Sequence, residues 1–279
     1  MSKKTLVLLL FLWPLTGFSA KIDSLTVWSA SMHKSVKNIA ILPKTYSASK
    51  QRFPVIYMLH GAGDDYRGWL EIAPEITRYA DLYNVILICP DGGNSSWYFD
   101  SPVDPTYRYE TYITKELISM VDIKYHTVSN KSGRGITGLS MGGHGAFFLA
   151  FRHTNLFGAA ASMSGGLDIR PFAEKWDLSK RLGPINQYPQ TWEKYTVINL
   201  VPSIQNKQLK LLFDCGRDDF FYSVNLQVHQ KMQELKIAHE FLAKSGGHTL
   251  VYWRSSVKNH IEFFNEFFRK PAIVETPGE

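Results

Sequence analysis

Short apolar runs alternate with longer amphipathic segments along most of the chain, and this alternation predicts its architecture. Continuous apolar runs predict strands covered on both faces, whereas apolar positions spaced three or four residues apart predict helices. The predicted strands are 27–31, 36–42, 54–59, 85–89, a short run before Ser140, 157–163, 210–213 and 239–243. The clearest predicted helices are 66–83, 110–125 and the buried segment 146–151. Strands that alternate with helices predict a doubly wound, mostly parallel α/β sheet.

The alternation lapses between residues 166 and 207, which indicates a small, irregular helical insertion over the edge of the sheet. The residues that interrupt the pattern are Pro171, Trp176, Pro184, Pro189, Trp192 and Pro202. Two interpretations stay open: an excursion of the chain that only packs, and a cap that lines a substrate pocket. Because the chain shows no internal repeats, we expect residues 21–279 to form a single domain.

The N-terminus has the features of a secretory signal peptide, which we place at residues 1–20. Lys3 and Lys4 precede an apolar run at 6–12, and the segment 17–20 offers a cleavage site in which Phe18 is larger than usual. The apolar run is too short to span a bilayer, so no stable membrane insertion is expected. We therefore predict an exported protein, periplasmic or extracellular.

Composition and charge narrow the class of partner. The chain of 279 residues is 44% apolar and carries a net charge of +6, which falls to +4 when residues 1–20 and their two lysines are removed (6 − 2). This charge is scattered, so no nucleic-acid partner is predicted. Cys89 and Cys215 each end an apolar run and are expected to be buried, with a disulfide as the alternative. No residues have metal-ligand spacing, so neither a metal nor an organic cofactor is expected.

The segment Gly138-Leu139-Ser140-Met141-Gly142 carries the strongest chemical signal in the chain. A Gly-x-Ser-x-Gly pattern between a strand and a helix holds the serine on a sharp, strained turn that exposes its Oγ atom. The residues two positions before and after the serine must be small, and both are glycine here. Ser140 is therefore the predicted nucleophile.

A serine nucleophile needs a base and a carboxylate, which on this fold follow in the chain order serine, acid, histidine. Asp219 and Asp218 both follow the predicted strand at 210–213; we assign Asp219 to the triad, and Asp218 to a helix cap or a surface role. Of the nine histidines, His248 lies in a turn after the last predicted strand and before a helix. Catalytic groups of open α/β sheets gather at the carboxyl ends of strands, so His248 is the predicted base.

The developing negative charge on the substrate requires two backbone N–H donors, an oxyanion hole. One is expected from Met141, directly after the nucleophile. The other is expected from Ala62, in the glycine-rich loop 60–63 that follows the strand 54–59. His60, in the same loop, is expected to be structural rather than a second base.

With these motifs placed, the chain resembles the serine-esterase family that includes esterase D, S-formylglutathione hydrolases, tributyrin esterases and feruloyl esterases. The matching segments run through nearly the whole of the chain after residue 20 and are 58–61, 91–98, 138–146, 164–166, 215–220 and 246–248. The resemblance implies an α/β-hydrolase fold. It also implies an acid three residues after Gly216, which is Asp219, and oxyanion donors at Ala62 and Met141.

The resulting hypothesis is an exported carboxylic-ester hydrolase that works through an acyl-enzyme on short-chain acyl, acetyl or feruloyl esters of carbohydrate. Aromatic residues predicted near the catalytic edge could stack on such a substrate, with core packing as the alternative. They are Trp97, Tyr98, Phe221 and Trp253, together with Trp192 and Tyr222. A second hypothesis is transfer of the acyl group to a sugar hydroxyl, as in mycolyltransferases. A third, a catalytically inactive binding module, is opposed by the intact serine, acid and histidine.

Overall fold

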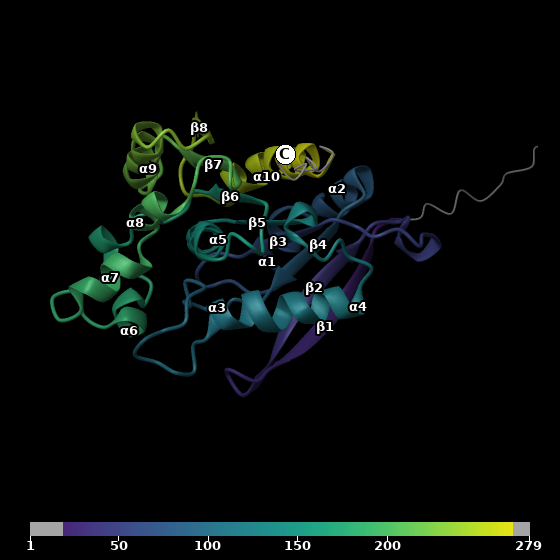
Figure 1. The fold of residues 1–279 in the computed structure, drawn as a ribbon, viewed down its shortest axis with the longest axis horizontal. Coiled ribbons are helices and arrows are strands. Elements are labelled where there is room, and N and C mark those ends of the chain that lie inside the picture. The colour runs from purple at the N-terminus through teal and green to yellow at the C-terminus, as the bar shows by residue number, and fades with distance from the viewer. Residues whose placement is uncertain (1–18, 270–279) are drawn as a thin grey trace, which may run out of the picture.

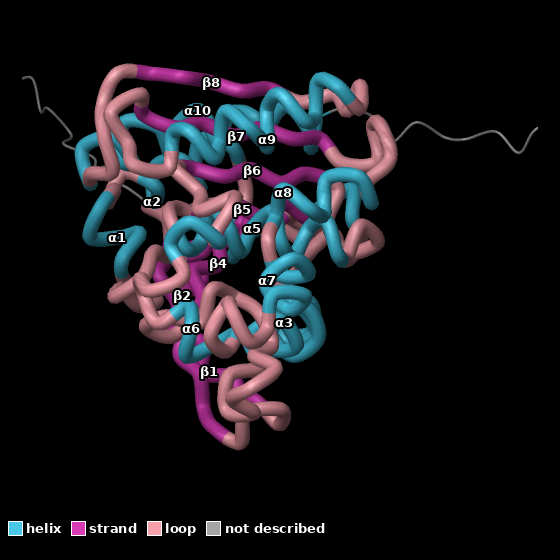
Figure 2. Tube along the Cα trace, turned by 90° about the vertical axis from the view of Figure 1, so that its left-hand side faces the viewer, coloured by secondary structure: helices cyan, strands magenta, loops and turns pink. Residues whose placement is uncertain are grey.

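The computed structural model describes residues 19–269, so residues 1–18 of the predicted signal peptide lie outside the described part of the chain. Within it, eight strands form one sheet in the order β1-β2-β4-β3-β5-β6-β7-β8 (Figure 2). Their bounds are β1 Lys21–Ser29, β2 Lys34–Leu42, β3 Val55–Leu59, β4 Ile86–Pro90, β5 Arg134–Gly138, β6 Ala159–Met163, β7 Lys210–Gly216 and β8 Glu240–Lys244.

The strand directions confirm the mostly parallel, doubly wound sheet. Neighbouring strands from β4 through β3, β5, β6 and β7 to β8 are parallel, whereas β2 is antiparallel to both β1 and β4. The carboxyl ends of the parallel strands therefore meet at one edge, where ligands bind in open α/β sheets.

The helices of the described residues cover both faces of the sheet (Figure 1). They are α1 Gly68–Ile72, α2 Ile76–Tyr83, α3 Tyr109–Thr111, α4 Ile118–Lys124, α5 Met141–Arg152, α6 Leu178–Leu182, α7 Pro189–Tyr195, α8 Val197–Leu200, α9 Tyr222–Glu234 and α10 Leu250–Arg269. The single helix predicted over 66–83 is wrong, because Ala73, before Pro74, leaves the helical conformation (φ −142°, ψ 72°). The helix predicted over 110–125 is present, with a π-helical turn, Tyr112–Leu117, between α3 and α4.

Each central strand of the sheet contributes side chains to two separate hydrophobic cores, because successive side chains point to opposite faces of the sheet. Val55, Tyr57 and Leu59 of β3 join the core that contains α4, α5 and α9. Ile56 and Met58 join the core beneath α1, α2 and α10. This two-sided burial explains why the strand reads as one continuous apolar run rather than as an alternating pattern.

Both cysteines are buried and unpaired, so the disulfide alternative is wrong. Cys89 lies in β4 and Cys215 in β7, and three strands of the sheet separate them. Burial raises the pKa of the Cys89 thiol to about 12, so it stays protonated and behaves as a small apolar side chain.

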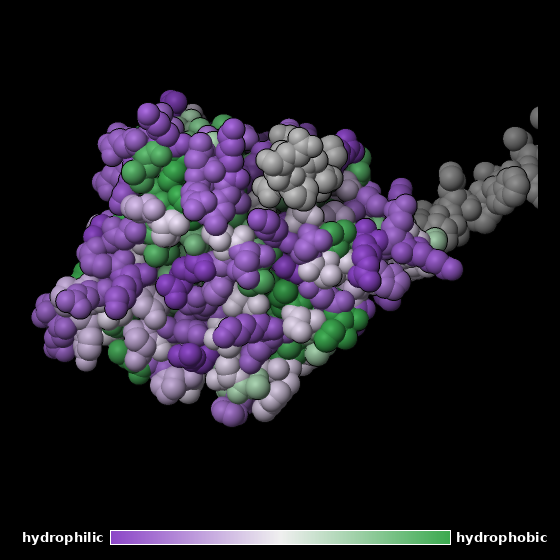
Figure 3. Space-filling model, in the orientation of Figure 1, coloured by the Kyte–Doolittle hydropathy of each residue, from purple (hydrophilic) through white to green (hydrophobic). Residues whose placement is uncertain are grey.

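The surface combines polar residues with small apolar patches, as the face in Figure 3 shows. Among residues 19–269, no helix combines the length and the apolar character needed to cross a bilayer.

The segment between β6 and β7 folds into the short helices α6, α7 and α8, flanked by 3-10 turns at Arg170–Phe172 and Val201–Ser203. Prolines stand in the first turn of α7 and of both 3-10 turns, where their missing N–H has no cost. Trp192 is fully buried and donates its indole N–H to the Gly183 carbonyl (3.0 Å). Much of this segment therefore packs as core.

His144 of α5 fastens this segment to the body of the protein. Its Nε2 lies 3.0 Å from the Tyr195 carbonyl in α7, so the imidazole donates from Nε2. The ring stacks on Phe148 (centroids 5.5 Å apart) and is fully buried. Burial lowers the pKa of His144 from 6.5 to about 4, because the cation would lose its hydration.

The lowered pKa predicts that part of the protein's stability is lost in mild acid. His144 stays neutral in the folded state, while an unfolded chain takes up the proton near pH 6.5, so stability falls as the pH drops from about 6.5 towards 4. In His144→Gln, whose amide can still donate to the Tyr195 carbonyl, we expect the loss of unfolding free energy between pH 7 and pH 5 to be smaller by about 2 kcal/mol. Urea unfolding at both pH values measures it.

The matched control is His126→Gln, which removes an exposed histidine. It should lose as much stability between the two pH values as the wild type does. Equal losses in wild type and His144→Gln would contradict the prediction.

Candidate active site

Ser140 sits on a strained turn between β5 and α5, with φ 55° and ψ −116°. The turn is closed by backbone contacts that leave no room for side chains. A Cβ on Gly138 would lie 2.3 Å from the Gly142 carbonyl oxygen, and a Cβ on Gly142 would lie 2.4 Å from the Leu59 carbonyl oxygen. The Ser140 N–H donates to the Met163 carbonyl of β6 (2.9 Å). The two glycines of the motif are thus required by the close approach of α5 to the end of β3.

Three side chains form one hydrogen-bonded chain at this turn. The Oγ of Ser140 lies 2.9 Å from Nε2 of His248. Nδ1 of His248 lies 2.9 and 3.0 Å from the two carboxylate oxygens of Asp219. The Asp219 side chain has no exposed surface, and that of His248 is 14% exposed. The structure thus brings the predicted nucleophile, base and acid within hydrogen-bond distance of one another.

The loops that carry the acid and the histidine are bonded directly to each other. The N–H of Arg217 donates to the Lys244 carbonyl (2.8 Å), and that of Asp218 donates to the Gly246 carbonyl (3.0 Å). A Cβ on Gly216 would lie 2.0 Å from the Gly246 carbonyl oxygen, so the loops approach too closely for any side chain there. This contact sets the position of His248 relative to the acid loop.

The two neighbouring aspartates have different tasks. Oδ1 of Asp219 accepts from the N–H of Phe221 (2.8 Å), so the carboxylate beside His248 also fixes the backbone of the residue that precedes α9. Asp218 is exposed and reaches only the Gly246 N–H, at 3.4 Å. Of the two roles predicted for Asp218, the surface role holds and the helix cap is wrong.

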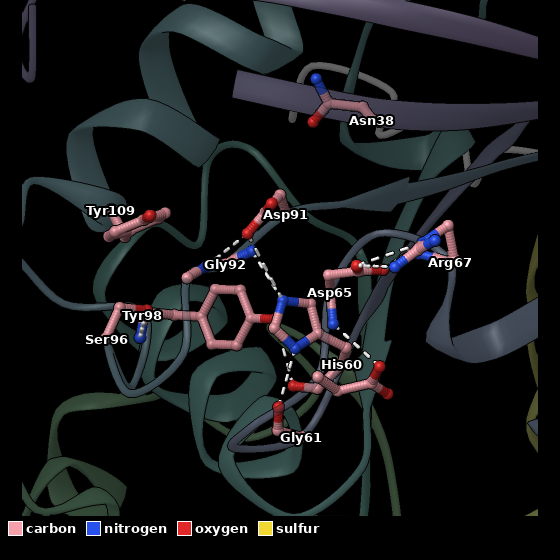
Figure 4. Close-up of polar contacts among 12 residues, drawn as sticks. Asn38, His60, Gly61, Asp65, Arg67, Asp91, Gly92, Ser96, Tyr98 and Tyr109 are labelled. Atoms are coloured by element: carbon pink, nitrogen blue, oxygen red, sulfur yellow. Dashed lines mark hydrogen bonds and ion pairs between the residues drawn. The ribbon is translucent and has the colours of Figure 1, made fainter. Parts of the chain in front are cut away.

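The loop after β3 is fixed by the buried side chain of His60 (Figure 4). The Gly92 N–H donates to Nε2 of His60 (2.8 Å), so Nε2 is unprotonated and Nδ1 donates to the Gly61 carbonyl (2.7 Å). The Tyr98 hydroxyl donates to the His60 carbonyl (3.1 Å). Burial lowers the pKa of His60, which keeps the imidazole neutral and both bonds intact. This is the structural role expected for His60.

The backbone amides of Ala62 and Met141 lie on segments that flank the serine. Met141 is the first residue of α5, and a Cβ on Gly61 would lie 3.6 Å from the Cβ of Ser140. Across residues 19–269, neither the Ala62 N–H nor the Met141 N–H has a hydrogen-bond acceptor. Two unused donors beside a nucleophile are what an oxyanion hole requires.

The structure corrects most of the predicted substrate contacts. Trp97, Tyr98 and Phe221 are at most 1% exposed and belong to the core, as Trp192 does, so they offer no surface to a substrate. Trp253 is 9% exposed and stands edge-on to the His248 ring, with centroids 4.9 Å apart. It packs against the predicted base rather than facing open space.

Two aromatic residues that were missed as substrate contacts do face solvent, and one of them lies beside His248. Phe220 is 48% exposed and its ring centroid lies 4.3 Å from that of His248. Trp176, 36% exposed, stacks on Phe220 (5.6 Å, 23°). The position of Phe220 directly after the predicted acid was the available signal.

No group of three or more histidine, cysteine, aspartate or glutamate side chains converges as metal ligands would within the described chain.

Comparison with known proteins assigns the chain to a family. Residues 29–263 match the model of the Esterase family, which is described as "Putative esterase". The chain belongs to this esterase family. An acetyl esterase of Caldicellulosiruptor saccharolyticus is 24% identical over 264 residues, which cover 88% of this chain and 98% of that one. A solved ferulic acid esterase superposes with a TM-score of 0.77 at 25% identity, over 90% of this chain and all of that one.

Other relatives are matched over part of their length. An esterase of Mycobacterium tuberculosis is 28% identical over 240 residues, or 75% of this chain and 51% of the relative, so the chain spans about half of that protein. The diacylglycerol acyltransferase/mycolyltransferase Ag85A of the same organism is 32% identical over 156 residues, or 53% of this chain and 44% of that one. The fold prediction is confirmed by these comparisons and by the sheet order.

The close contact between Gly142 and the end of β3 predicts a large loss of activity in Gly142→Ala. The added Cβ would lie 2.4 Å from the Leu59 carbonyl oxygen and 2.6 Å from that of His60, so α5 or the loop 60–63 must shift. A shift of about 1 Å at such a site costs about a hundredfold in kcat/KM. Steady-state kinetics on a simple ester measures it.

Gly68→Ala is the matched control, because its Cβ would meet the Asp64 carboxylate, a side chain that can rotate away, rather than backbone atoms. We expect that variant to keep wild-type kinetics. Wild-type kinetics in Gly142→Ala would contradict the steric argument.

Proposed function

We propose that this protein hydrolyses carboxylic esters through an acyl-enzyme on Ser140. The observation that carries the proposal is the continuous hydrogen-bonded chain from Ser140 through His248 to the buried Asp219. A serine hydroxyl is a weak nucleophile until a base takes its proton, and here the base stands 2.9 Å away.

In the first half of the reaction, His248 takes the proton of Oγ as that oxygen bonds to the ester carbonyl carbon. Asp219, which accepts from Nδ1, holds the imidazole in the tautomer that leaves Nε2 free and stabilises the imidazolium that forms. The N–H groups of Ala62 and Met141 donate to the negative oxygen of the tetrahedral intermediate.

Collapse of this intermediate breaks the bond to the alcohol oxygen, which receives the proton from Nε2 of His248. In the second half, His248 takes a proton from water as the water oxygen attacks the acyl carbon, and it gives that proton to Oγ of Ser140 as the acyl–oxygen bond breaks and the acid leaves. No residue outside the serine turn, the loop 60–63 and the two bonded loops is needed for these steps.

The substrates proposed are short-chain acyl, acetyl or feruloyl esters of carbohydrate, met by an exported protein outside the cytoplasm. The names of two relatives, an acetyl esterase and a ferulic acid esterase, support the acyl groups. The basic flank and apolar run at the N-terminus support export.

A second candidate is transfer of the acyl group to a sugar hydroxyl in place of water. The similarity of 156 residues to a mycolyltransferase favours it, because the same three side chains would form the same acyl-enzyme. The two functions differ only in which hydroxyl attacks in the second half of the reaction.

The proposal predicts that Ser140→Ala abolishes turnover of p-nitrophenyl acetate and labelling by a fluorophosphonate probe. Asp219→Asn should keep the fold and lower kcat by about 10⁴-fold, because the imidazole is then held in the wrong tautomer. Circular dichroism checks folding. Absence of wild-type labelling would exclude both hydrolysis and transfer.

A panel of acetyl, butyryl and feruloyl esters and acetylated xylan, each assayed with and without added sugar, separates the two functions. A hydrolase yields free acid whether or not the sugar is present. New sugar ester formed in preference to free acid would establish transfer instead.

A further inference from the structure

Trp176 and Phe220 form an exposed, stacked pair beside His248, here called the aromatic wall. The wall joins two distant segments, because Trp176 belongs to the insertion at 166–207 and Phe220 to the acid loop. Its rings lie 5.6 Å apart and nearly parallel, at 23°. Burial of large apolar side chains would stabilise the fold, so apolar side chains that stay exposed next to a reactive group indicate a binding surface.

The backbone beneath Trp176 is held in a conformation that needs support. Trp176 (φ 49°) and Asp177 (φ 58°) both have positive φ, and so does Trp97 (φ 54°), against which Trp176 packs. The indole N–H of Trp97 donates to the Trp176 carbonyl (3.2 Å), and the Ser95 hydroxyl donates to the Asp177 carboxylate (3.0 Å). Strained backbone that its surroundings fix in this way concentrates at ligand sites.

Phe220 is supported from below by the buried ring of Phe221. Phe172, from the insertion, meets Phe221 edge-on at 4.9 Å and lies 6.4 Å from Phe220. The wall therefore stands on a packed aromatic base, and its two outer rings are held in place while they remain open to solvent.

The position of the aromatic wall relative to Ser140 and His248 indicates which part of the ester it contacts. The proposed mechanism directs the carbonyl oxygen of the ester to the amides of Ala62 and Met141. When the bond from the acyl carbon to the alcohol oxygen breaks, that oxygen takes the proton from Nε2 of His248, so the alcohol must lie on the histidine side. Phe220 is the exposed ring next to this histidine, with its centroid 4.3 Å from that of His248.

We propose that Trp176 and Phe220 form the subsite for the alcohol part of the ester and select alcohols that contain a ring. Aromatic faces bind flat apolar surfaces, such as the C–H face of a pyranose or an aromatic ring. A short linear alcohol is too small to cover two stacked rings. This inference rests on the proposed esterase function and adds a specificity to one side of that site.

The test compares two esters that share the acetyl group, methyl acetate and a monoacetylated methyl xyloside. Both give the same acyl-enzyme, so any difference in kcat/KM arises from the alcohol during acylation. In Trp176→Leu and Phe220→Leu, we expect kcat/KM to fall about three- to tenfold for the xyloside and less than about twofold for methyl acetate.

Trp28→Leu is the matched control. Trp28 is 60% exposed on β1, at the opposite edge of the sheet from β8, which precedes His248. Both esters should retain wild-type kcat/KM in this variant.

Three results would overturn the proposal. Equal losses for the two acetyl esters would mean that the wall serves the site in general. A loss for methyl ferulate but not for methyl acetate would mean that it binds the acyl group. A shift of the pH profile with unchanged preference would mean that Phe220 acts only on the imidazole. Failure of the esterase function itself looks different, because the wild type would then neither react with the fluorophosphonate probe nor turn over any ester.

Discussion

The close packing of α5 against the end of β3 is the constraint on which the rest of the site depends. Because Gly142 has no side chain, the backbone at the start of α5 reaches within contact of the Leu59 and His60 carbonyls. That one approach exposes Ser140 on its turn and brings the loop 60–63 beside it. The positions of the predicted nucleophile and of the predicted oxyanion donors thus follow from a single backbone contact rather than from separate side-chain interactions.

A buried polar network holds the histidine side of the site to the same framework. Burial alone would raise the pKa of Asp214 in β7, but His260 at 3.0 Å, together with Ser256, lowers it, so the carboxylate stays charged. The other nitrogen of His260 lies 2.8 Å from the hydroxyl of Thr137 in β5, the strand that leads to the serine. Tyr252 also donates to Asp214 (3.1 Å). The helix that follows His248 is therefore tied to the strands that carry the serine and the acid.

Most of the framework could be predicted from the sequence because each part leaves a local signal. Strands buried on both faces appear in the sequence as continuous apolar runs. The glycines around Ser140 are needed because a side chain at either position would clash with the backbone. The break at Ala73 was also readable, since Pro74 follows it. The sequence does not show which way the side chains of Trp97 and Tyr98 point. Their backbone has positive φ (54° and 60°), and both rings are buried in the core.

The pair Phe220 and Phe221 shows why the substrate side of the site is harder to predict than the catalytic side. The two residues are of the same type and adjacent in sequence, yet Phe220 is 48% exposed and Phe221 is fully buried. Which one faces outward depends on the insertion that packs against them, through Phe172 and Trp176. The predicted catalytic side chains are positioned by backbone contacts at the edge of the sheet, whereas the exposed aromatic surface beside them comes from side chains of two segments. Under the proposed function, a substitution in the aromatic wall would change which alcohol is selected without moving Ser140, because the hydrogen bonds from Ser140 to His248 and from His248 to Asp219 involve neither ring.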